Sequence, residues 1–185
     1  MDVWQELEHK CLNCTNCELC KGRHNVVFGV GNKNADIMFI GEGPGEQEDL
    51  QGVPFVGPAG RLLDDMLSII DLDRTKVYIA NIVKCRPPYN RDPQETEEQA
   101  CIGYLRKQIE LIQPKVIVCL GRIAARQIIY SEFKITREHG QWINRDGVWY
   151  TAIYHPSALL RDLSKRPDTF EDLLFIRDKM REIGI

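Results

Sequence analysis

A glycine-rich stretch with acidic side chains is the first group of residues that could do chemistry. The sequence GEGPGEQED at 41–49 follows the apolar run IMFI and contains three glycines and four carboxylates. A phosphate-binding P-loop would close on Gly-Lys-Ser/Thr, and this stretch does not. Glycines let a backbone approach a ligand closely, and carboxylates suit a cationic group or a water molecule. A solvated surface loop is the alternative interpretation of the same residues.

Three further residues could hold a flat ligand beside this stretch. Asn81 ends the apolar run KVYIAN, and its amide presents a donor and an acceptor side by side, as the edge of a pyrimidine does. Phe55 lies between glycines in VPFVGPAG, where its ring could cover a planar group. His155 precedes Pro156, so the chain must turn where the imidazole emerges. The structural alternatives are a strand-end turn residue, a core phenylalanine and a structural histidine.

Seven cysteines form a second group, and four of them are crowded into CLNCTNCELC at 11–20. Inside cells, where disulfides are rare, an odd number of cysteines favours metal binding. A local ligand set would be Cys11, Cys14, Cys17 and Cys20. A distributed set would be Cys14, Cys17, Cys85 and Cys101. Cys119 lies in a predicted buried strand and is expected in the core, and the spacing leaves zinc and an iron–sulfur cluster both open.

Basic side chains form a third group in a chain that is acidic overall. The net charge is −3, so the protein as a whole lacks an electrostatic footprint for nucleic acid, and a polyanion would need a local basic surface. The residues that could supply one are Lys84, Arg86, Arg91, Arg161, Lys165 and Arg166. Scattered solvated charges are the alternative.

The elements that must position these groups alternate between strands and helices. Continuous apolar runs predict strands buried on both faces, at 35–41, 76–81 and 115–121. Helical spacing predicts helices between and after them, at about 57–70, 92–112 and 122–129. A hairpin that turns at 146–147 leads into His155. This alternation predicts an α/β fold with a parallel sheet, in which ligands bind beyond the carboxyl ends of the strands, where Asn81 and His155 fall.

Length and hydropathy limit the remaining choices. A chain of 185 residues fits one domain, and we expect residues 1–185, with the cysteine-rich loop 11–20, to form it. No apolar run reaches the length of about 18 residues that spans a membrane, and the charged N-terminus lacks the apolar block of a signal peptide. We therefore expect a cytoplasmic monomer without a membrane partner.

Several stretches occur in a fixed order along the chain: GEGPGEQED, PFVGPAG, NIVKCRPPYNRDP with Cys101 beyond it, and HPSALLR. Together they resemble the family 4 uracil-DNA glycosylases, the iron–sulfur members of the uracil-DNA glycosylase superfamily. The resemblance runs from about Cys14 to the C-terminus. It implies a three-layer α/β/α domain around a short central parallel sheet.

The resemblance also implies a cofactor and a reaction. The cofactor is a [4Fe–4S] cluster, which favours the distributed cysteines Cys14, Cys17, Cys85 and Cys101. The reaction is hydrolysis of the bond between uracil and deoxyribose in single- and double-stranded DNA, which releases the base and leaves an abasic site. Neither active-site motif contains lysine, so we expect base excision without strand cleavage. Whether the protein also contacts a replication clamp stays open.

Roles for individual residues follow from the same resemblance. Phe55 would stack on an everted uracil, and Asn81 would read its O4 and N3–H edge. His155 would stabilise the departing base near O2, together with backbone N–H groups of the turn that includes Gly43 and Pro44. The superfamily's better-known branch has aspartate where this chain has Gly43. The resemblance therefore makes Glu42 and Glu48 the candidates for handling water, and we favour Glu48.

Contacts with DNA are expected from two segments. One is HPSALLR, with Ser157, Leu159 and Arg161, and the other is the loop that carries Lys84 and Arg86. Leu159 lies on the segment that pushes into the duplex gap in relatives, and core packing is its alternative. Three rival functions remain: a non-catalytic iron–sulfur module that binds nucleic acid, a glycosylase for other deaminated bases, and an unrelated zinc hydrolase.

Overall fold

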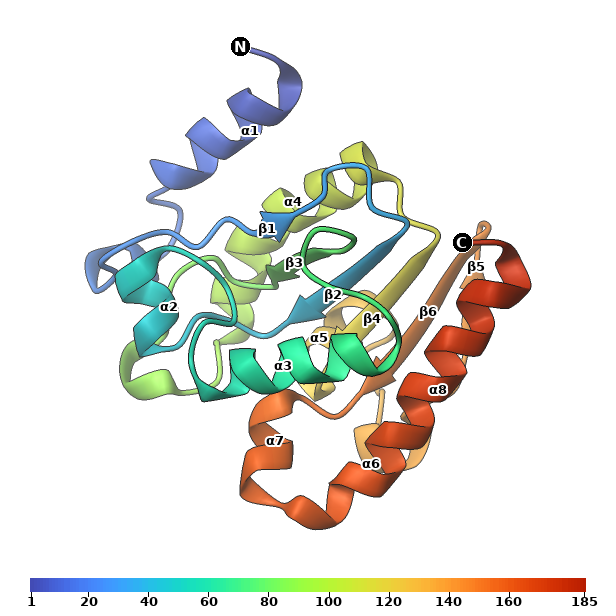
Figure 1. Ribbon diagram of the computed structural model, residues 1–185. Helices are drawn as coiled ribbons and strands as arrows, with labels where there is room; N and C mark the ends of the chain where they lie inside the picture. Colours follow the sequence, from blue (N-terminus) through green and yellow to red (C-terminus); the bar gives the residue numbers. More distant parts are fainter.

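The computed structural model describes residues 1–185 as a six-stranded sheet with helices on both faces (Figure 1). The strand order is β1-β3-β2-β4-β6-β5. The inner strands are parallel to one another: β2 (Ile37–Gly41), β3 (Tyr78–Asn81), β4 (Val116–Leu120) and β6 (Val148–Ile153). The edge strands are antiparallel: β1 (Val30–Gly31) and β5 (Ile143–Arg145). The predicted α/β class with a central parallel sheet is confirmed, with one antiparallel strand added at each edge.

The helices connect the parallel strands and cover the sheet. The α-helices are α1 (Val3–Leu12), α2 (Glu46–Gln51), α3 (Pro58–Ile69), α4 (Glu95–Ile112), α5 (Arg122–Ile128), α6 (Ile135–Glu138), α7 (Pro156–Arg161) and α8 (Arg166–Ile183). Short 3-10 turns are η1 (Glu18–Lys21), η2 (Pro88–Asn90) and η3 (Leu163–Lys165). None of these helices combines the length and the apolar character that crossing a membrane requires.

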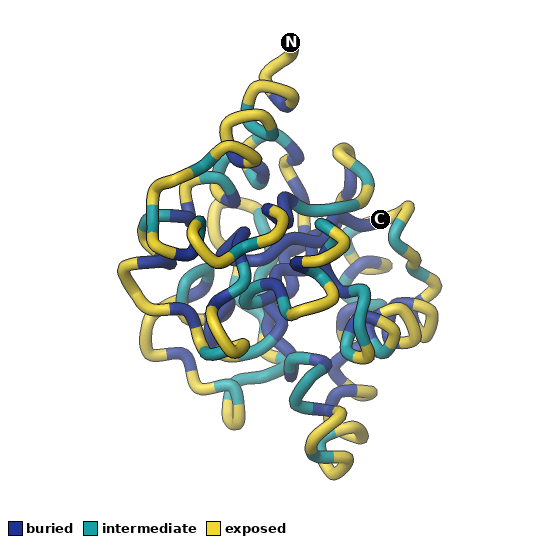
Figure 2. Tube along the Cα trace, turned by 90° about the vertical axis from the view of Figure 1, so that its left-hand side faces the viewer, coloured by how far each residue is buried: buried dark blue, intermediate teal, exposed yellow.

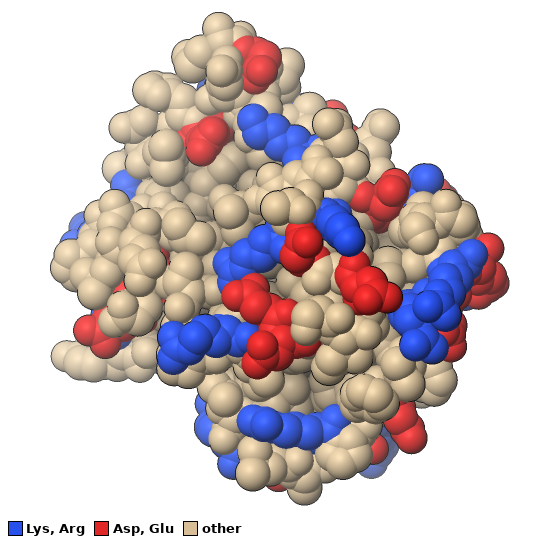
Figure 3. Space-filling model, viewed as in Figure 1, with Lys and Arg blue, Asp and Glu red and all other residues tan.

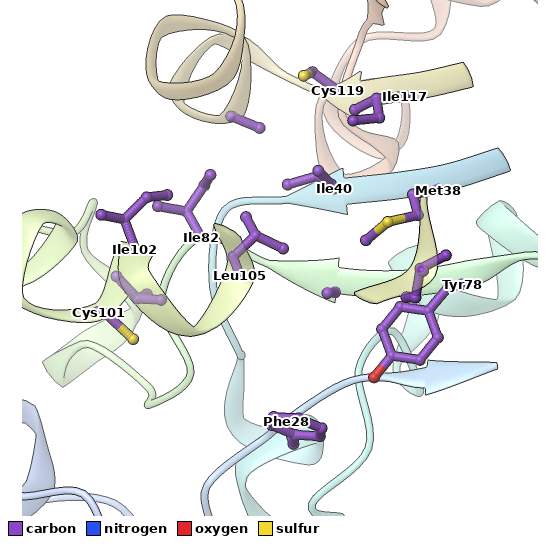
Figure 4. Packing of buried hydrophobic residues seen from close by; sticks show 14 of the residues in the cluster. Phe28, Met38, Ile40, Tyr78, Ile82, Cys101, Ile102, Leu105, Ile117 and Cys119 are labelled. Carbon is purple, nitrogen blue, oxygen red and sulfur yellow. The ribbon is translucent and has the colours of Figure 1, made fainter. Parts of the chain in front are cut away.

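Apolar side chains fill the space on each side of the sheet, and buried residues gather at the centre of the molecule (Figure 2). Every residue of β2 and β4 is buried, because helices cover both faces of these strands. One core includes residues of α1, α4 and α5, and Figure 4 shows Met38 and Ile40 of β2 in it beside Leu105 of α4. The other core includes Phe39 of the same strand and Leu63 of α3. Alternate residues of β2 therefore serve opposite layers.

The predicted acidic loop is partly helical. Helix α2 begins at Glu46, and the side chain of Glu48 caps it by accepting a hydrogen bond of 3.0 Å from the backbone N–H of Gly45. Asp49 on the same helix is buried and accepts backbone hydrogen bonds from His24 at 2.8 Å and Asn25 at 3.3 Å. These bonds tie the chain just after the cysteine-rich loop 11–20 to the acidic stretch 41–49. The segments that carry the cysteines and the carboxylates are therefore held together.

Candidate active site and cysteine pocket

A cavity of about 480 Å³ opens beyond the carboxyl ends of the parallel strands. Its lining brings together most of the predicted active-site residues, which are Glu42, Gly43, Pro44, Glu48, Phe55, Asn81, His155, Ser157 and Arg161. They come from the segment between β2 and α3, which includes α2, from the end of β3 and from α7. These parts lie side by side because the strands that lead into them are parallel. The prediction that the loop at Gly41, Asn81 and His155 share one edge of the sheet is therefore confirmed. On the face shown in Figure 3, acidic and basic side chains are interspersed.

The amide of Asn81 lies at the end of β3 without a partner. Its side chain is only 2% exposed, and Oδ1 accepts no hydrogen bond in the protein. Gly41 lies opposite it in the sheet register, and a Cβ there would come within 2.5 Å of Oδ1 and 2.7 Å of the Phe55 ring. A buried polar atom left unpaired costs about 1–3 kcal/mol. An amide held at this cost beside a cavity is suited to a ligand that pairs with it.

The Phe55 ring is positioned by an unusual backbone. Its φ of 54° lies in the left-handed region, which costs a bulky residue about 1–3 kcal/mol unless the surroundings enforce it. Arg74 donates hydrogen bonds to the carbonyls of Pro54, at 2.8 Å, and Phe55. A side chain at Gly60 would collide with the Phe55 carbonyl. The strained turn is therefore enforced from two sides, and it sets the ring centroid 5.5 Å from the imidazole of His155.

His155 is the N-terminal cap of α7. Its Nδ1 accepts a hydrogen bond of 3.0 Å from the backbone N–H of Ser157, so in the neutral ring the proton is carried by Nε2. Burial lowers the pKa of His155 to about 4, and the positive charge of Arg161 acts in the same direction. The imidazole is therefore neutral near pH 7 and can donate one hydrogen bond from Nε2.

Glu42 has the most perturbed carboxyl group in the cavity. Burial and, to a smaller extent, the nearby Asp92 raise the pKa of Glu42 to about 7, while Arg122 opposes the shift. Asp92 and Arg122 are themselves paired at 2.6 Å. A carboxyl group with this pKa exchanges its proton near neutral pH, which is the property expected of a general base. The pairing of Asp92 with Arg122 had no sequence signal, because these residues are 30 positions apart.

Glu48 is occupied by backbone hydrogen bonds. Oε1 accepts one from Gly45 at 3.0 Å, and Oε2 accepts two, from Gly57 at 3.1 Å and Val56 at 3.3 Å. A carboxylate has about four acceptor positions, so three are already filled. Glu48 thereby fastens the segment after Phe55 to the start of α2. Its hydrogen bonding suits a positioning role better than the predicted activation of water.

Two predicted DNA contacts are wrong because the side chains are buried. Lys84 is 1% exposed, and its Nζ donates hydrogen bonds to the carbonyl of Phe28 at 2.9 Å and to Gln108 Oε1 at 2.7 Å. Leu159 is 2% exposed and belongs to the core that contains Leu63, so its alternative, core packing, is correct. Arg86, by contrast, is half-buried.

Six of the seven cysteines line a second, smaller pocket, namely Cys11, Cys14, Cys17, Cys20, Cys85 and Cys101. N–H groups point at the sulfurs of three: Asn16 at Cys14 (3.4 Å), Arg23 at Cys85 (3.5 Å) and the Lys84 backbone at Cys101 (3.2 Å). Such donors stabilise negatively charged thiolates. Cys119 is buried in β4 as predicted.

The geometry of this pocket can be compared with what a metal centre requires. No three His, Cys, Asp or Glu side chains converge closely enough for a single metal ion. A cluster of four irons holds its thiolate ligands farther apart than one ion does, and the pocket offers thiols with N–H donors around them. The residues present therefore fit a [4Fe–4S] cluster, and both cysteine sets reach the same pocket.

The fold and the cavity define an α/β protein with acidic, amide and imidazole side chains around a cavity at the rim of its parallel sheet. Comparisons with known proteins give its family. The model of the "Uracil DNA glycosylase superfamily" matches residues 28–175. The chain therefore belongs to the uracil DNA glycosylase superfamily.

Within that superfamily the chain is similar over nearly its full length to several type-4 enzymes. A type-4 uracil-DNA glycosylase of Archaeoglobus fulgidus is 48% identical over 86% of this chain and 84% of its own. Another, of Sulfurisphaera tokodaii, is 42% identical over 100% of this chain and 86% of its own. A third, of Thermotoga maritima, is 44% identical over 88% and 86%. Identity of this level over nearly full length places the chain in the type-4 group.

Proposed function

We propose that the protein is a uracil-DNA glycosylase that hydrolyses the N-glycosidic bond of deoxyuridine in DNA. The observation that carries this proposal is the unpartnered amide of Asn81 at the edge of a cavity that also contains Phe55 and His155. The type-4 relatives bear the name of this activity. Uracil released from DNA leaves an abasic site, which is the first intermediate of base excision repair.

Recognition of the base rests on the Asn81 amide. Uracil offers N3–H as a donor and O4 as an acceptor, which pair with Oδ1 and Nδ2 respectively. Cytosine reverses this pattern, so its binding would leave two buried groups mispaired at about 1–3 kcal/mol each. The Phe55 ring stacks on the base, which adds about 1–3 kcal/mol without regard to sequence. Together these contacts bind uracil and favour it over cytosine.

Bond cleavage then requires stabilisation of two charges. The electron pair of the C1′–N1 bond leaves with uracil, whose negative charge spreads to O2, and the Nε2–H of His155 donates to it. A neutral imidazole suits this step because its Nε2–H can donate a hydrogen bond to O2 while the ring itself carries no charge. Water adds to the cationic C1′ of the sugar, and the ionised carboxylate of Glu42 accepts the proton that the water releases. Glu48 positions the loop and Phe55.

The cysteine pocket supports a resident [4Fe–4S] cluster held by Cys14, Cys17, Cys85 and Cys101. When bound, the cluster would cross-link the N-terminal loop to the segment after β3, which contributes stability rather than a step of the hydrolysis. The distributed set connects distant parts of the chain, whereas the local set would not. Of the two remaining thiols, Cys11 on α1 is buried and Cys20 is more exposed.

The ligand assignment is tested by single cysteine substitutions. Cys85→Ser and Cys101→Ser should lose the broad visible absorbance of the cluster and most of the bound iron and sulfide, whereas Cys20→Ser should keep both. Absorbance spectra and iron analysis of anaerobically purified variants give the answer. Loss in Cys20→Ser with retention in Cys101→Ser would assign the cluster to the local set instead.

The DNA is proposed to lie across the mouth of the cavity and to contact Ser157 and Arg161, which line it, and Arg86, which is half-buried in the loop after β3. Both single- and double-stranded DNA are proposed substrates, since the base must leave the stack in either case. We further propose that the protein acts as a monomer in the cytoplasm.

Oligonucleotides with one deoxyuridine, offered as a single strand or in U·A and U·G duplexes, test the reaction. Cluster-loaded protein should convert each to a strand that alkali cleaves at the former uracil, and the DNA should remain intact before alkali. A second oligonucleotide, with hypoxanthine in place of uracil, tests the alternative that the enzyme acts on other deaminated bases. Binding without alkali-sensitive sites would contradict the proposal and indicate a non-catalytic module.

A further inference from the structure

An everted uracil leaves a gap in the duplex, and the residue expected to fill it cannot do so. Leu159 is buried in the core that also contains Leu63 of α3, and it cannot turn outward without opening that core. We propose that Tyr89 instead inserts into the duplex at the site of the missing base and stacks on its neighbours. This inference rests on the proposed glycosylase function and assigns a further residue to its work on duplex DNA.

Tyr89 is placed at the rim of the cavity and has no packing partner. Its side chain is 99% exposed, more than that of any other large apolar or aromatic residue. It belongs to the loop between β3 and α4, and four other residues of this loop line the active-site cavity: Pro87, Asn90, Arg91 and Asp92. DNA that delivers a base into the cavity therefore lies close to the loop that carries Tyr89.

The backbone at Tyr89 holds the side chain outward. Tyr89 has a φ of 55° and Asn90 a φ of 54°, and two successive left-handed residues are unusual when neither is glycine. A bulky ring in this conformation lowers the stability of the free protein. The Tyr89 ring itself makes no packing contact inside the protein that would offset that loss, so the ring is available for a contact with another molecule.

The loop below Tyr89 is braced, so the ring is presented from a fixed base. The backbone N–H of Asn90 donates to the carbonyl of Pro87 at 3.1 Å, and the Asn90 side chain accepts from Arg86 at 2.8 Å. Arg91 pairs with both carboxylate oxygens of Glu97, at 2.8 and 2.9 Å. A preorganised loop loses little conformational freedom when it binds.

Two leucines are the alternative wedge residues. Leu160 and Leu163 follow Leu159 and are 42% and 63% exposed, in a segment whose Arg161 and Lys165 line the cavity. Proteins that bend DNA do insert leucine between bases. Tyr89 is favoured because its ring can stack on a base face, which a leucine side chain cannot do. Leu163 therefore serves as the matched comparison for the same assay.

The experiment compares Tyr89→Gly, Tyr89→Phe and Leu163→Ala with the wild type, all cluster-loaded. Glycine suits a positive φ, so Tyr89→Gly should fold at least as well, which thermal melting checks. Uracil release is measured on one sequence as a single strand and as a U·A duplex. We expect Tyr89→Gly to lower kcat/KM on the duplex about 10- to 100-fold, with the single strand changed less than about twofold. Tyr89→Phe and Leu163→Ala should stay near the wild type on both.

Three results would overturn the inference. They are an unchanged duplex rate in Tyr89→Gly, an equal loss on both substrates, and a duplex-specific loss in Leu163→Ala alone. The last would assign insertion to the segment after α7. A wild type that releases no uracil from either substrate would instead refute the proposed function, so failure of the inference and failure of the function give different results.

Discussion

Replacing Asn81 with leucine is expected to remove most uracil excision without destabilising the free protein. The amide loses two hydrogen bonds to the base, and N3–H and O4 of uracil are left buried and unpaired. At about 1–3 kcal/mol for each, kcat/KM should fall about 10²- to 10⁴-fold. In the free protein the substitution removes an unpaired buried oxygen and replaces it with a side chain of similar size.

The two effects of Asn81→Leu therefore have opposite signs. Thermal unfolding should show a Tm equal to or above that of the wild type, while single-turnover assays show the loss of activity. Iron content serves as the control that the cluster is loaded. A Tm that falls together with the activity would mean that Asn81 is a structural residue, and its role in reading uracil would then lack support.

Substitution of Glu42 by glutamine is expected to be nearly as severe and to change the pH dependence. The wild-type rate in single turnover should rise about tenfold per pH unit up to about pH 7 and then level off, because only ionised Glu42 can accept the proton from water. His155, with a pKa of about 4, stays neutral across this range and adds no further step. Glu42→Gln should be about 10²- to 10⁴-fold slower and independent of pH between about 5 and 9.

Glu48→Gln is the matched control for this measurement. Its new amide NH₂ would face backbone N–H groups of Gly45 or Gly57 and disturb the loop, so the rate should fall. The rise toward neutral pH should nevertheless remain, since Glu42 is intact. A pH dependence that disappears in Glu48→Gln and persists in Glu42→Gln would return the water-activating role to Glu48.

The parts of the site that depend on strand ends are predictable from the sequence. Continuous apolar runs identify strands buried on both faces, and parallel strands must bring their carboxyl ends to one edge. The loop at Gly41, Asn81 and His155 can therefore be grouped from the amino-acid sequence alone. The orphaned state of the Asn81 amide cannot, because it depends on what all neighbouring elements leave unpaired.

At the predicted DNA contacts, the direction in which each side chain points could not be predicted from the sequence. Leu159 and Leu160 are successive residues of a short helix and point about 100° apart, so which of them faces the core depends on where α7 packs. Lys84 can be buried because Gln108 and a carbonyl of Phe28 accept hydrogen bonds from its side chain, and these partners are 24 and 56 residues away. Lysine is rarely buried without such partners, and none is visible from local sequence.

Backbone conformation was the second limit. The left-handed turn at Phe55 is enforced by Arg74 and by close packing at Gly60, which are contacts between residues that no local pattern connects. The capping role of Glu48 became visible only with α2, whose six residues are too short for a clear helical period. Glu42 was predicted to be the less favoured of the two carboxylates for activating water. Burial by residues distant in the sequence raises its pKa, and no local pattern indicates that burial.

The structure of the cluster-loaded protein with free uracil tests the central claim most directly. We predict that the base stacks on Phe55, with its N3–H donating to Asn81 Oδ1, its O4 accepting from Nδ2, and its O2 accepting from Nε2 of His155. Uracil bound at another place, or bound in the cavity with the Asn81 amide still unpaired, would contradict the proposed mode of recognition.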